Sequence, residues 1–348
     1  MNKLFGFGHA DVDVYHNLPK VELHRHLEGS LRVQTLIDIA NAHSITLPMG
    51  IMKLGRQVQV QSDEPFTFEN FLAKFNVLRL FYRSPEVIHR ITKEAIEDAA
   101  KDNVKYMELR FTPVALSRAE RFPLNEVVNW VCTSAKEAAR KHGITVKLIA
   151  SVNRHESPEL AEQVAWIAAS NLENGIVALD LAGNEAQFPA APFVGIFKEA
   201  KQAGLFTTLH AGEWGTAQNV RQAIEDFEAD RIGHGVRVLE DDYTTALARE
   251  RKTPFEVCIT SNYQSGVVQT IAAHPFKKMV EAGLNVTINT DDPSISQITL
   301  TSEFKVAAEQ LGVPLETLKM RVMAAVLATF QPEADRIKLA DTLRKQLK

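Results

Sequence analysis

The chain of 348 residues contains only 2 cysteines, Cys132 and Cys258. Two cysteines are too few for a cysteine-rich zinc module, an iron–sulfur site or a disulfide framework. No apolar run reaches the ~20 residues that a membrane-spanning helix needs. No block of Lys and Arg marks a nucleic-acid-binding surface. We therefore expect neither a membrane nor a nucleic acid among the partners.

Several catalytic motifs are also missing. The sequence has no glycine-rich phosphate loop, no His-Glu-x-x-His helix motif and no Gly-x-Ser-x-Gly nucleophile turn. The His-x-Glu and Pro-Cys-x-x-Cys signature of cytidine deaminases is absent as well.

The segment Met1–His16 has one Lys and no sustained apolar stretch, so it does not resemble a signal peptide. A cytoplasmic location is the expectation.

Short apolar runs of β type alternate with longer stretches of helical periodicity along the whole chain. The predicted strands are Val21–His24, Tyr106–Phe111, Val146–Ala150, Ile176–Leu181, Phe206–His210, Arg231–His234, Phe255–Ile259 and Asn285–Asn289. The predicted helices between them include Ser84–Lys101, Pro123–Lys141, Ser157–Leu172, Ala191–Gln202 and Ala272–Ala282. Continuously apolar strands alternating with helices are typical of parallel sheets that are covered on both faces.

The fold class that fits best is α/β, an eightfold (β/α)8 TIM barrel, and an open doubly wound sheet is the alternative. The insertion after the first strand is long enough to place extra helices, within about 44–100, over the barrel mouth as a lid. Ser302–Lys348 adds helices at the C-terminus. We expect residues 1–348 to form a single domain.

Five of the predicted strands end in histidine or carboxylate residues, and these ends meet at one rim of such a barrel. The residues are His24-Arg25-His26, Gly183-Asn184-Glu185, His210-Ala211-Gly212-Glu213, His234 and Asp291-Asp292. A polar residue at one strand end means little, but five on the same rim indicate an active site.

His24 and His26 are two residues apart, so a strand places both imidazoles on one side. His210 and Asp291 would complete a shell of three nitrogens and one oxygen that leaves a position for water. This ligand set favours zinc. Two-metal barrel hydrolases usually have a bridging lysine or carboxylate at the end of the fourth strand. Leu181-Ala182-Gly183 offers none, so we expect one zinc per chain.

Two further residues are predicted to move protons. A metal would lower the pKa of bound water toward ~7, and His234 is placed to accept the proton. Glu213 lies three residues after His210 and could carry a proton to the leaving side of a substrate. As an isolated residue, Glu213 would more simply be an exposed acid or a helix-capping residue.

With these residues in hand, the chain resembles the adenosine deaminase family of metal-dependent hydrolases. The resemblance is collinear from Leu18 to about Pro293. It rests on the segments Leu18–Ser30, Phe71–Phe75, Tyr106–Phe111, Asp180–Gly183, His210–Glu213, Arg231–Gly235, Ser261–Gly266 and Asn289–Pro293.

The resemblance implies that water activated by zinc attacks C6 of a 6-aminopurine and that ammonia leaves. It implies His24, His26, His210 and Asp291 as zinc ligands and Glu213 as the proton donor to purine N1. His234 would orient and deprotonate the water. The substrate contacts would be His26, Glu28, the backbone of Gly183 at purine N3, Asp292 at N7, and Phe71 and Phe75 as lid residues. Phe71 and Phe75 are also spaced for ordinary helix packing.

The resemblance makes adenosine and 2′-deoxyadenosine the first substrates to expect. Glu28 stands where adenosine deaminases commonly carry Asp, and many adenine deaminases of the superfamily have Glu there. Asn184 replaces the commoner Asp, and Cys258 lacks the Pro that often follows it. Adenine, or a larger 6-aminopurine such as aminodeoxyfutalosine, is therefore the alternative substrate. A third reading is an idle purine-binding protein, which the complete set of site residues argues against.

Overall fold

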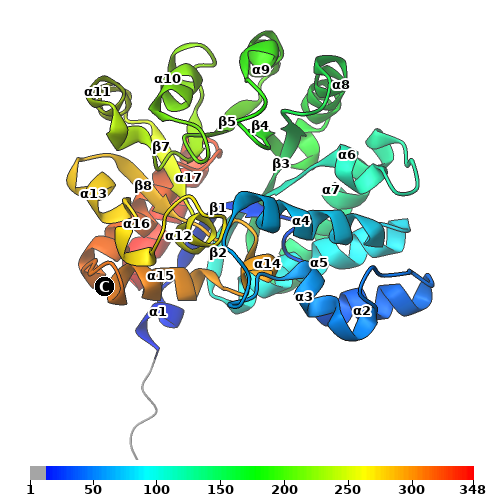
Figure 1. Cartoon of the computed structure of the whole chain (residues 1–348). Coiled ribbons are helices and arrows are strands. Elements are labelled where there is room, and N and C mark those ends of the chain that lie inside the picture. Colours follow the sequence, from blue (N-terminus) through cyan, green and yellow to red (C-terminus); the bar gives the residue numbers. More distant parts are fainter. Residues whose placement is uncertain (1–12) are drawn as a thin grey trace, which may run out of the picture.

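The computed structural model describes residues 13–348, and the first twelve residues of the segment Met1–His16 lie outside it. Eight parallel strands form one sheet in the order β1 to β8, so each strand pairs with its neighbour in sequence (Figure 1). They are β1 (Lys20–His26), β2 (Val104–Phe111), β3 (Thr145–Asn153), β4 (Ile176–Ala182), β5 (Phe206–Ala211), β6 (Arg231–His234), β7 (Pro254–Val257) and β8 (Asn285–Ile288). The predicted barrel is confirmed.

The sheet closes between β8 and β1 just after β8 ends. Arg25 and Asp291 form a parallel bridge there. The Asp291 N–H donates to the His24 carbonyl at 2.8 Å, and the His26 N–H donates to the Asp291 carbonyl at 2.8 Å. The closure therefore joins three of the predicted metal ligands through their own backbone.

Outer helices follow the strands and cover the sheet (Figure 1). They are α5 (Pro85–Lys101), α7 (Leu124–His142), α8 (Pro158–Ala169), α9 (Val194–Gln202), α10 (Ala217–Glu225), α11 (Asp242–Arg251), α13 (Phe276–Glu281) and α16 (Leu315–Leu327). The Ser84 and Ser157 side chains cap the helices that begin at Pro85 and Pro158. Helix α16 packs against β8 and β1, and thus covers the closure.

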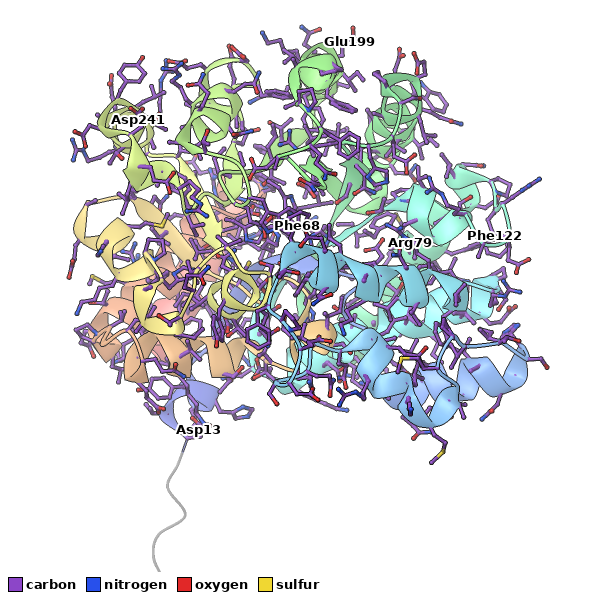
Figure 2. All side chains as sticks on the ribbon, in the orientation of Figure 1. Asp13, Phe68, Arg79, Phe122, Glu199 and Asp241 are labelled. Atoms are coloured by element: carbon purple, nitrogen blue, oxygen red, sulfur yellow. The ribbon has the colours of Figure 1, made fainter. Side chains whose placement is uncertain are left out.

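The remaining elements are short connections and additions. They are α1 (Val14–Asn17), α2 (Val33–Ala42), η1 (Ile51–Lys53), α3 (Leu54–Val58), α4 (Phe68–Leu78), η2 (Arg79–Phe81), α6 (Pro113–Ser117), η3 (Leu172–Asn174), η4 (Ala191–Phe193), η5 (Val238–Glu240), α12 (Ile259–Gln264), η6 (Ile271–Ala273), α14 (Pro293–Ser296), α15 (Leu300–Glu309) and α17 (Glu333–Gln346). Figure 2 labels Phe68, the first residue of α4, and Arg79, the first residue of η2. No helix among residues 13–348 is long and apolar enough to cross a membrane.

Two predicted boundaries are wrong. The seventh strand ends at Val257 rather than at Ile259, because α12 begins there with Cys258 as its N-cap. The helix predicted over Ala272–Ala282 is broken, and α13 starts only at Phe276. Pro275 causes this break, since a proline disfavours helical dihedrals in the residue before it, and His274 has an extended ψ of 131°.

Charged side chains line the lower interior of the barrel. Arg231 Nη2 lies 2.5 Å from Glu108 Oε2, and Arg231 Nε lies 2.5 Å from Glu256 Oε1. Arg231 Nη1 donates to the Ala328 carbonyl at 2.8 Å. The Arg231 guanidinium also lies 3.5 Å from the centroid of the Phe330 ring. We call Tyr106, Glu108, Arg231 and Glu256, with the segment Ala328–Phe330, the barrel floor.

Candidate active site

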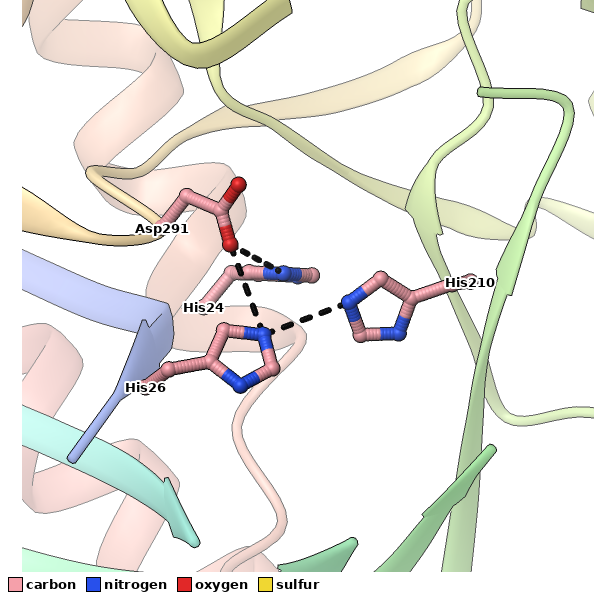
Figure 3. A group of neighbouring side chains, drawn as sticks. All are labelled: His24, His26, His210 and Asp291. Atoms are coloured by element: carbon pink, nitrogen blue, oxygen red, sulfur yellow. Dashed lines mark hydrogen bonds and ion pairs between the residues drawn. The ribbon is translucent and has the colours of Figure 1, made fainter. Parts of the chain in front are cut away.

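Four predicted metal ligands converge at the carboxyl end of the barrel (Figure 3). His24 and His26 come from β1, His210 from β5, and Asp291 from the loop after β8. His24 Nε2 lies 3.2 Å and His26 Nε2 lies 3.4 Å from Asp291 Oδ1. The Nε2 atoms of His26 and His210 are 3.3 Å apart. One donor atom from each residue lies within 4.8 Å of all the others.

The hydrogen bonds around these imidazoles suit a metal. His24 Nδ1 lies 2.7 Å from Glu256 Oε2, and His210 Nδ1 lies 3.0 Å from Asp180 Oδ1. Because a carboxylate accepts, each Nδ1 carries the proton and each Nε2 turns a lone pair toward the cluster. His24 Nε2 is buried and has no hydrogen-bond partner among the described residues. Burial also lowers the pKa of His26 well below its usual range, which favours the neutral, ligating imidazole.

A second group of possible ligands overlaps the first. His24, His234, Cys258 and Asp291 also meet the distance condition, and both groups share His24 and Asp291, so they describe one centre. Burial raises the pKa of the Cys258 thiol well above its usual range. The thiolate that would bind a metal is therefore disfavoured, and the set of three imidazoles and Asp291 fits better.

Two residues of the site other than glycine have left-handed backbone. Asp291 has φ of 64° and His234 has φ of 60°, a region that few residues other than glycine adopt. Such conformations persist where the surrounding structure holds them, commonly at active sites. Gly29 is constrained for a different, steric reason, because a Cβ at this position would lie 1.8 Å from Asp292 Oδ1. A glycine is thus needed for Asp292 to reach the cavity.

Glu213 and His234 lie beside the metal ligands. Glu213 Oε2 is 3.6 Å from His234 Nε2, and His234 Nε2 is 3.9 Å from Asp291 Oδ2. Burial, with the negative charges of Asp291 and Glu185, raises the pKa of Glu213 well above its usual range. Burial lowers the pKa of His234 well below its usual range. The site thus favours a protonated carboxyl on Glu213 and a neutral imidazole on His234. A proton donor and a neutral hydrogen-bonding group therefore lie side by side next to the metal ligands.

Glu185 holds the loop that carries Glu213. Its Oε1 accepts backbone N–H bonds from Glu213 at 2.6 Å, Trp214 at 2.9 Å and Gly215 at 3.0 Å. Its Oε2 accepts from the Gly212 N–H at 2.9 Å. One buried carboxyl from the β4 loop therefore fixes four successive peptides of the β5 loop.

The predicted substrate residues line one cavity next to the ligands. His26, Glu28, Phe71, Phe75, Gly183 and Asp292 all border it, together with Arg79, Tyr82 and Trp214. Four buried polar atoms at this cavity have no hydrogen-bond partner within residues 13–348, namely Glu28 Oε2, Tyr82 Oη, Trp214 Nε1 and Asp292 Oδ1. A larger cleft of about 760 Å³ beside α15 contains none of the predicted catalytic residues or metal ligands.

The sequence analysis assigned no supporting role to four residues that hold the site together, although Glu185 was among the strand-end residues and Asp180 and Asn262 lay in segments of the resemblance. Asp180 and Glu256 orient two of the histidines, Glu185 anchors the Glu213 loop, and Asn262 lies 3.0 Å from His234. Each joins segments that are far apart in sequence. The available signal was an acidic residue in an otherwise apolar strand, as at Asp180 and Glu256, since such a residue must find a buried partner.

The sequence profile of the adenosine deaminase family matches residues 19–346. The chain belongs to this family. An adenosine deaminase of Klebsiella pneumoniae is 35% identical over 330 residues, which cover 94% of this chain and 98% of that one.

Solved structures of other proteins are similar to this chain over nearly its whole length. An adenine deaminase from Arthrobacter aurescens superposes with a TM-score of 0.87 at 25% identity, covering 94% of this chain and 98% of that one. A zinc-containing amidohydrolase from Burkholderia ambifaria gives a TM-score of 0.83 at 26% identity, covering 96% of this chain and 93% of that one. This family member is thus a hydrolase of the purine-deaminase type with a metal-binding group of His and Asp side chains.

Proposed function

We propose that the protein hydrolyses adenosine and 2′-deoxyadenosine to inosine and 2′-deoxyinosine with release of ammonia. The observation that carries the proposal is the position of Glu213, a buried carboxyl with a raised pKa at 3.6 Å from His234 and beside the metal ligands. The relative from Klebsiella pneumoniae, named as an adenosine deaminase, supports the choice of substrate. We further propose that residues 1–348 act as one domain, and the cytoplasmic location remains a prediction.

We propose zinc as the metal, held by His24, His26, His210 and Asp291. The three imidazole nitrogens and one carboxylate match the ligands that zinc prefers, and the neighbour from Burkholderia ambifaria contains zinc. A bound zinc would supply a Lewis acid that lowers the pKa of water toward ~7.

The proton donor in this proposal is Glu213. Attack at C6 of the purine moves negative charge onto N1, so a donor at N1 stabilises the intermediate. A carboxyl can donate only while protonated, and the burial of Glu213 favours that state. His234 faces the same space and would orient the attacking water.

Further contacts would hold the purine. Burial and the nearby charge of Asp291 raise the pKa of Asp292 well above its usual range, so this carboxyl can donate to N7. The Gly183 backbone would contact N3. Phe71 and Phe75 border the cavity with ring centroids 6.4 Å apart, and Phe71 is also buried in the core. Both lid and packing roles are compatible with this position.

Adenine or a larger 6-aminopurine is the second candidate substrate, and Glu28 is the observation that favours it. Its Oε1 accepts the Thr112 N–H at 2.6 Å, whereas its Oε2 is buried and has no partner among residues 13–348. Burial raises the pKa of Glu28 to about 7. A neutral carboxyl here could bind a ribose hydroxyl or a purine ring nitrogen. The adenine deaminase from Arthrobacter aurescens has the same fold.

A substrate panel on the zinc-loaded protein separates these candidates. Ultraviolet assays would compare kcat/KM for adenosine, 2′-deoxyadenosine, adenine and aminodeoxyfutalosine. We expect adenosine and 2′-deoxyadenosine to be the best substrates. Faster turnover of adenine or aminodeoxyfutalosine would replace the first proposal by the second. Binding without turnover of any purine would indicate a catalytically idle protein.

A further inference from the structure

Four buried groups form a chain of hydrogen bonds that ends at His234. The Phe276 N–H donates to His274 Nδ1 at 3.0 Å. His274 Nε2 lies 3.2 Å from Asn262 Oδ1, and Asn262 Nδ2 lies 3.0 Å from His234 Nδ1. Asn262 is fully buried, and His274 and His234 are nearly so. The chain connects the start of α13, through α12, to the end of β6.

The direction of these bonds follows from the first donor. A backbone N–H can only donate, so His274 Nδ1 must accept. Burial lowers the pKa of His274 to about 3, so its ring is neutral at ordinary pH and carries its one proton on Nε2. His274 Nε2–H therefore donates to Asn262 Oδ1. The other end of the Asn262 amide, the NH2 group, then donates to His234 Nδ1.

We infer that this relay of Phe276, His274 and Asn262 holds His234 in the tautomer whose proton sits on Nε2, facing the cavity. Within residues 13–348, the carboxylates that pair with His234 Nε2 are 3.6 Å away at Glu213 and 3.9 Å away at Asp291, both too far for a hydrogen bond. The His234 N–H is thus free to donate to an oxygen atom in the cavity. Asn262 and His274 are positioning residues that act through His234.

The consequence for catalysis rests on the proposed function. In this tautomer His234 donates a hydrogen bond to the oxygen that attacks C6, and so turns a lone pair of that oxygen toward the purine. A histidine that removes a proton at Nε2 requires the opposite tautomer, with its proton on Nδ1. The two roles differ in the position of one proton, and no bond is made or broken at His234 in the role inferred here.

Nitrogen-15 NMR of the zinc-loaded protein with labelled histidine measures the tautomer directly. The His234 signals are assigned by their loss in His234→Gln. We expect Nε2 to be protonated and Nδ1 unprotonated, and a protonated Nδ1 would overturn the inference. This measurement requires no turnover, so it tests the tautomer even if the protein converts no purine. A lack of turnover would refute the proposed function and not the inferred tautomer.

Asn262→Asp tests the positioning role. A carboxylate at 262 accepts from both histidines, so it should move the His234 proton to Nδ1. Loss of a donor to the reacting oxygen should lower kcat by roughly 100- to 1,000-fold, with zinc content unchanged and KM changed much less. Asn171→Asp, at the end of α8, is the matched control and should change neither. If Asn262→Asp moves the His234 proton and leaves kcat unchanged, the inferred role of His234 as a donor is wrong. If the variant does not fold, the spectrum of the wild-type protein still decides the tautomer.

Discussion

The floor and the mouth of the barrel are both lined by charged side chains, but they differ in whether those side chains have partners. On the floor, both oxygens of Glu108 and of Glu256 accept hydrogen bonds, and all three guanidinium nitrogens of Arg231 donate. At the mouth, buried polar atoms of Glu28, Tyr82, Trp214 and Asp292 have no partner within the described chain.

This difference separates two uses of buried charge. A buried ion needs partners, because leaving one unpaired costs several kcal/mol. On the floor, the charged side chains are one another's partners, and these contacts hold the strands of the barrel together. At the mouth, buried carboxyls lack such partners, and burial raises the pKa of Glu28, Glu213 and Asp292. At the floor, nearby arginines hold the pKa of Glu256 well below its usual range, although burial alone would raise it. Unpaired groups of this kind are expected where a ligand supplies the partner.

Glu213→Gln, at the mouth of the barrel, should give the largest effect, which is a loss of catalytic rate. The amide cannot donate a carboxyl proton, so kcat should fall by roughly 100- to 10,000-fold. Zinc content and thermal stability should be retained, because Glu213 is not among the four ligands. Steady-state kinetics and metal analysis measure these quantities, with Glu162→Gln on the exposed face of α8 as control. Turnover equal to wild type would remove Glu213 from the mechanism.

Arg231→Met should affect the floor much more than the mouth. The variant leaves Glu108 and Glu256 without their shared partner, so the free energy of unfolding should fall by about 3–5 kcal/mol. Urea unfolding measures this loss. Because Glu256 Oε2 keeps its contacts with Arg110 and His24 Nδ1, kcat per folded molecule should fall far less than in Glu213→Gln. Arg344→Met removes an exposed pair with Asp341 and should cost no more than about 1 kcal/mol. Equal losses in the two variants would contradict the role of the floor.

Glu185→Ala should affect the mouth indirectly. Without the carboxyl that fixes four peptides, the Glu213 loop can shift, and a displacement near 1 Å costs on the order of 100-fold in rate. Asp230→Asn is the matched control, because Asp230 accepts the Thr207 N–H at 2.8 Å at the opposite end of β5. We expect kcat to fall in Glu185→Ala only, with zinc retained in both. A loss of equal size in both variants would point to general instability.

The last expected effect concerns the pH dependence of stability. Burial raises the pKa of Glu303 to about 7, while its ordinary value is 4.5. Between these values the folded protein keeps a proton that the unfolded chain has released. Its contribution to stability is therefore full below pH 4.5 and is lost as the pH rises toward 7, by at most about 1.4 kcal/mol per pH unit. Urea unfolding across this range should show a weaker decline in Glu303→Gln. Parallel curves for the two proteins would refute the shift.

The barrel and the converging ligands were predictable because both follow from local periodicity. Alternating apolar runs and helices specify the βα units, and the spacing of His24 and His26 places two imidazoles on one side of a strand. The supporting roles of Glu185 and Asn262 were not predictable, because each residue has its partner 28 positions away in sequence. Such contacts depend on the packing of whole βα units, which no local pattern reports.

Titration of the chelator-treated protein with zinc, followed by adenosine turnover, tests the central claim most directly. The account predicts no turnover without metal and a rise to a plateau at one zinc per chain, since His24, His26, His210 and Asp291 form one centre. Full turnover before zinc is added, or a plateau only at two zinc ions per chain, would contradict it.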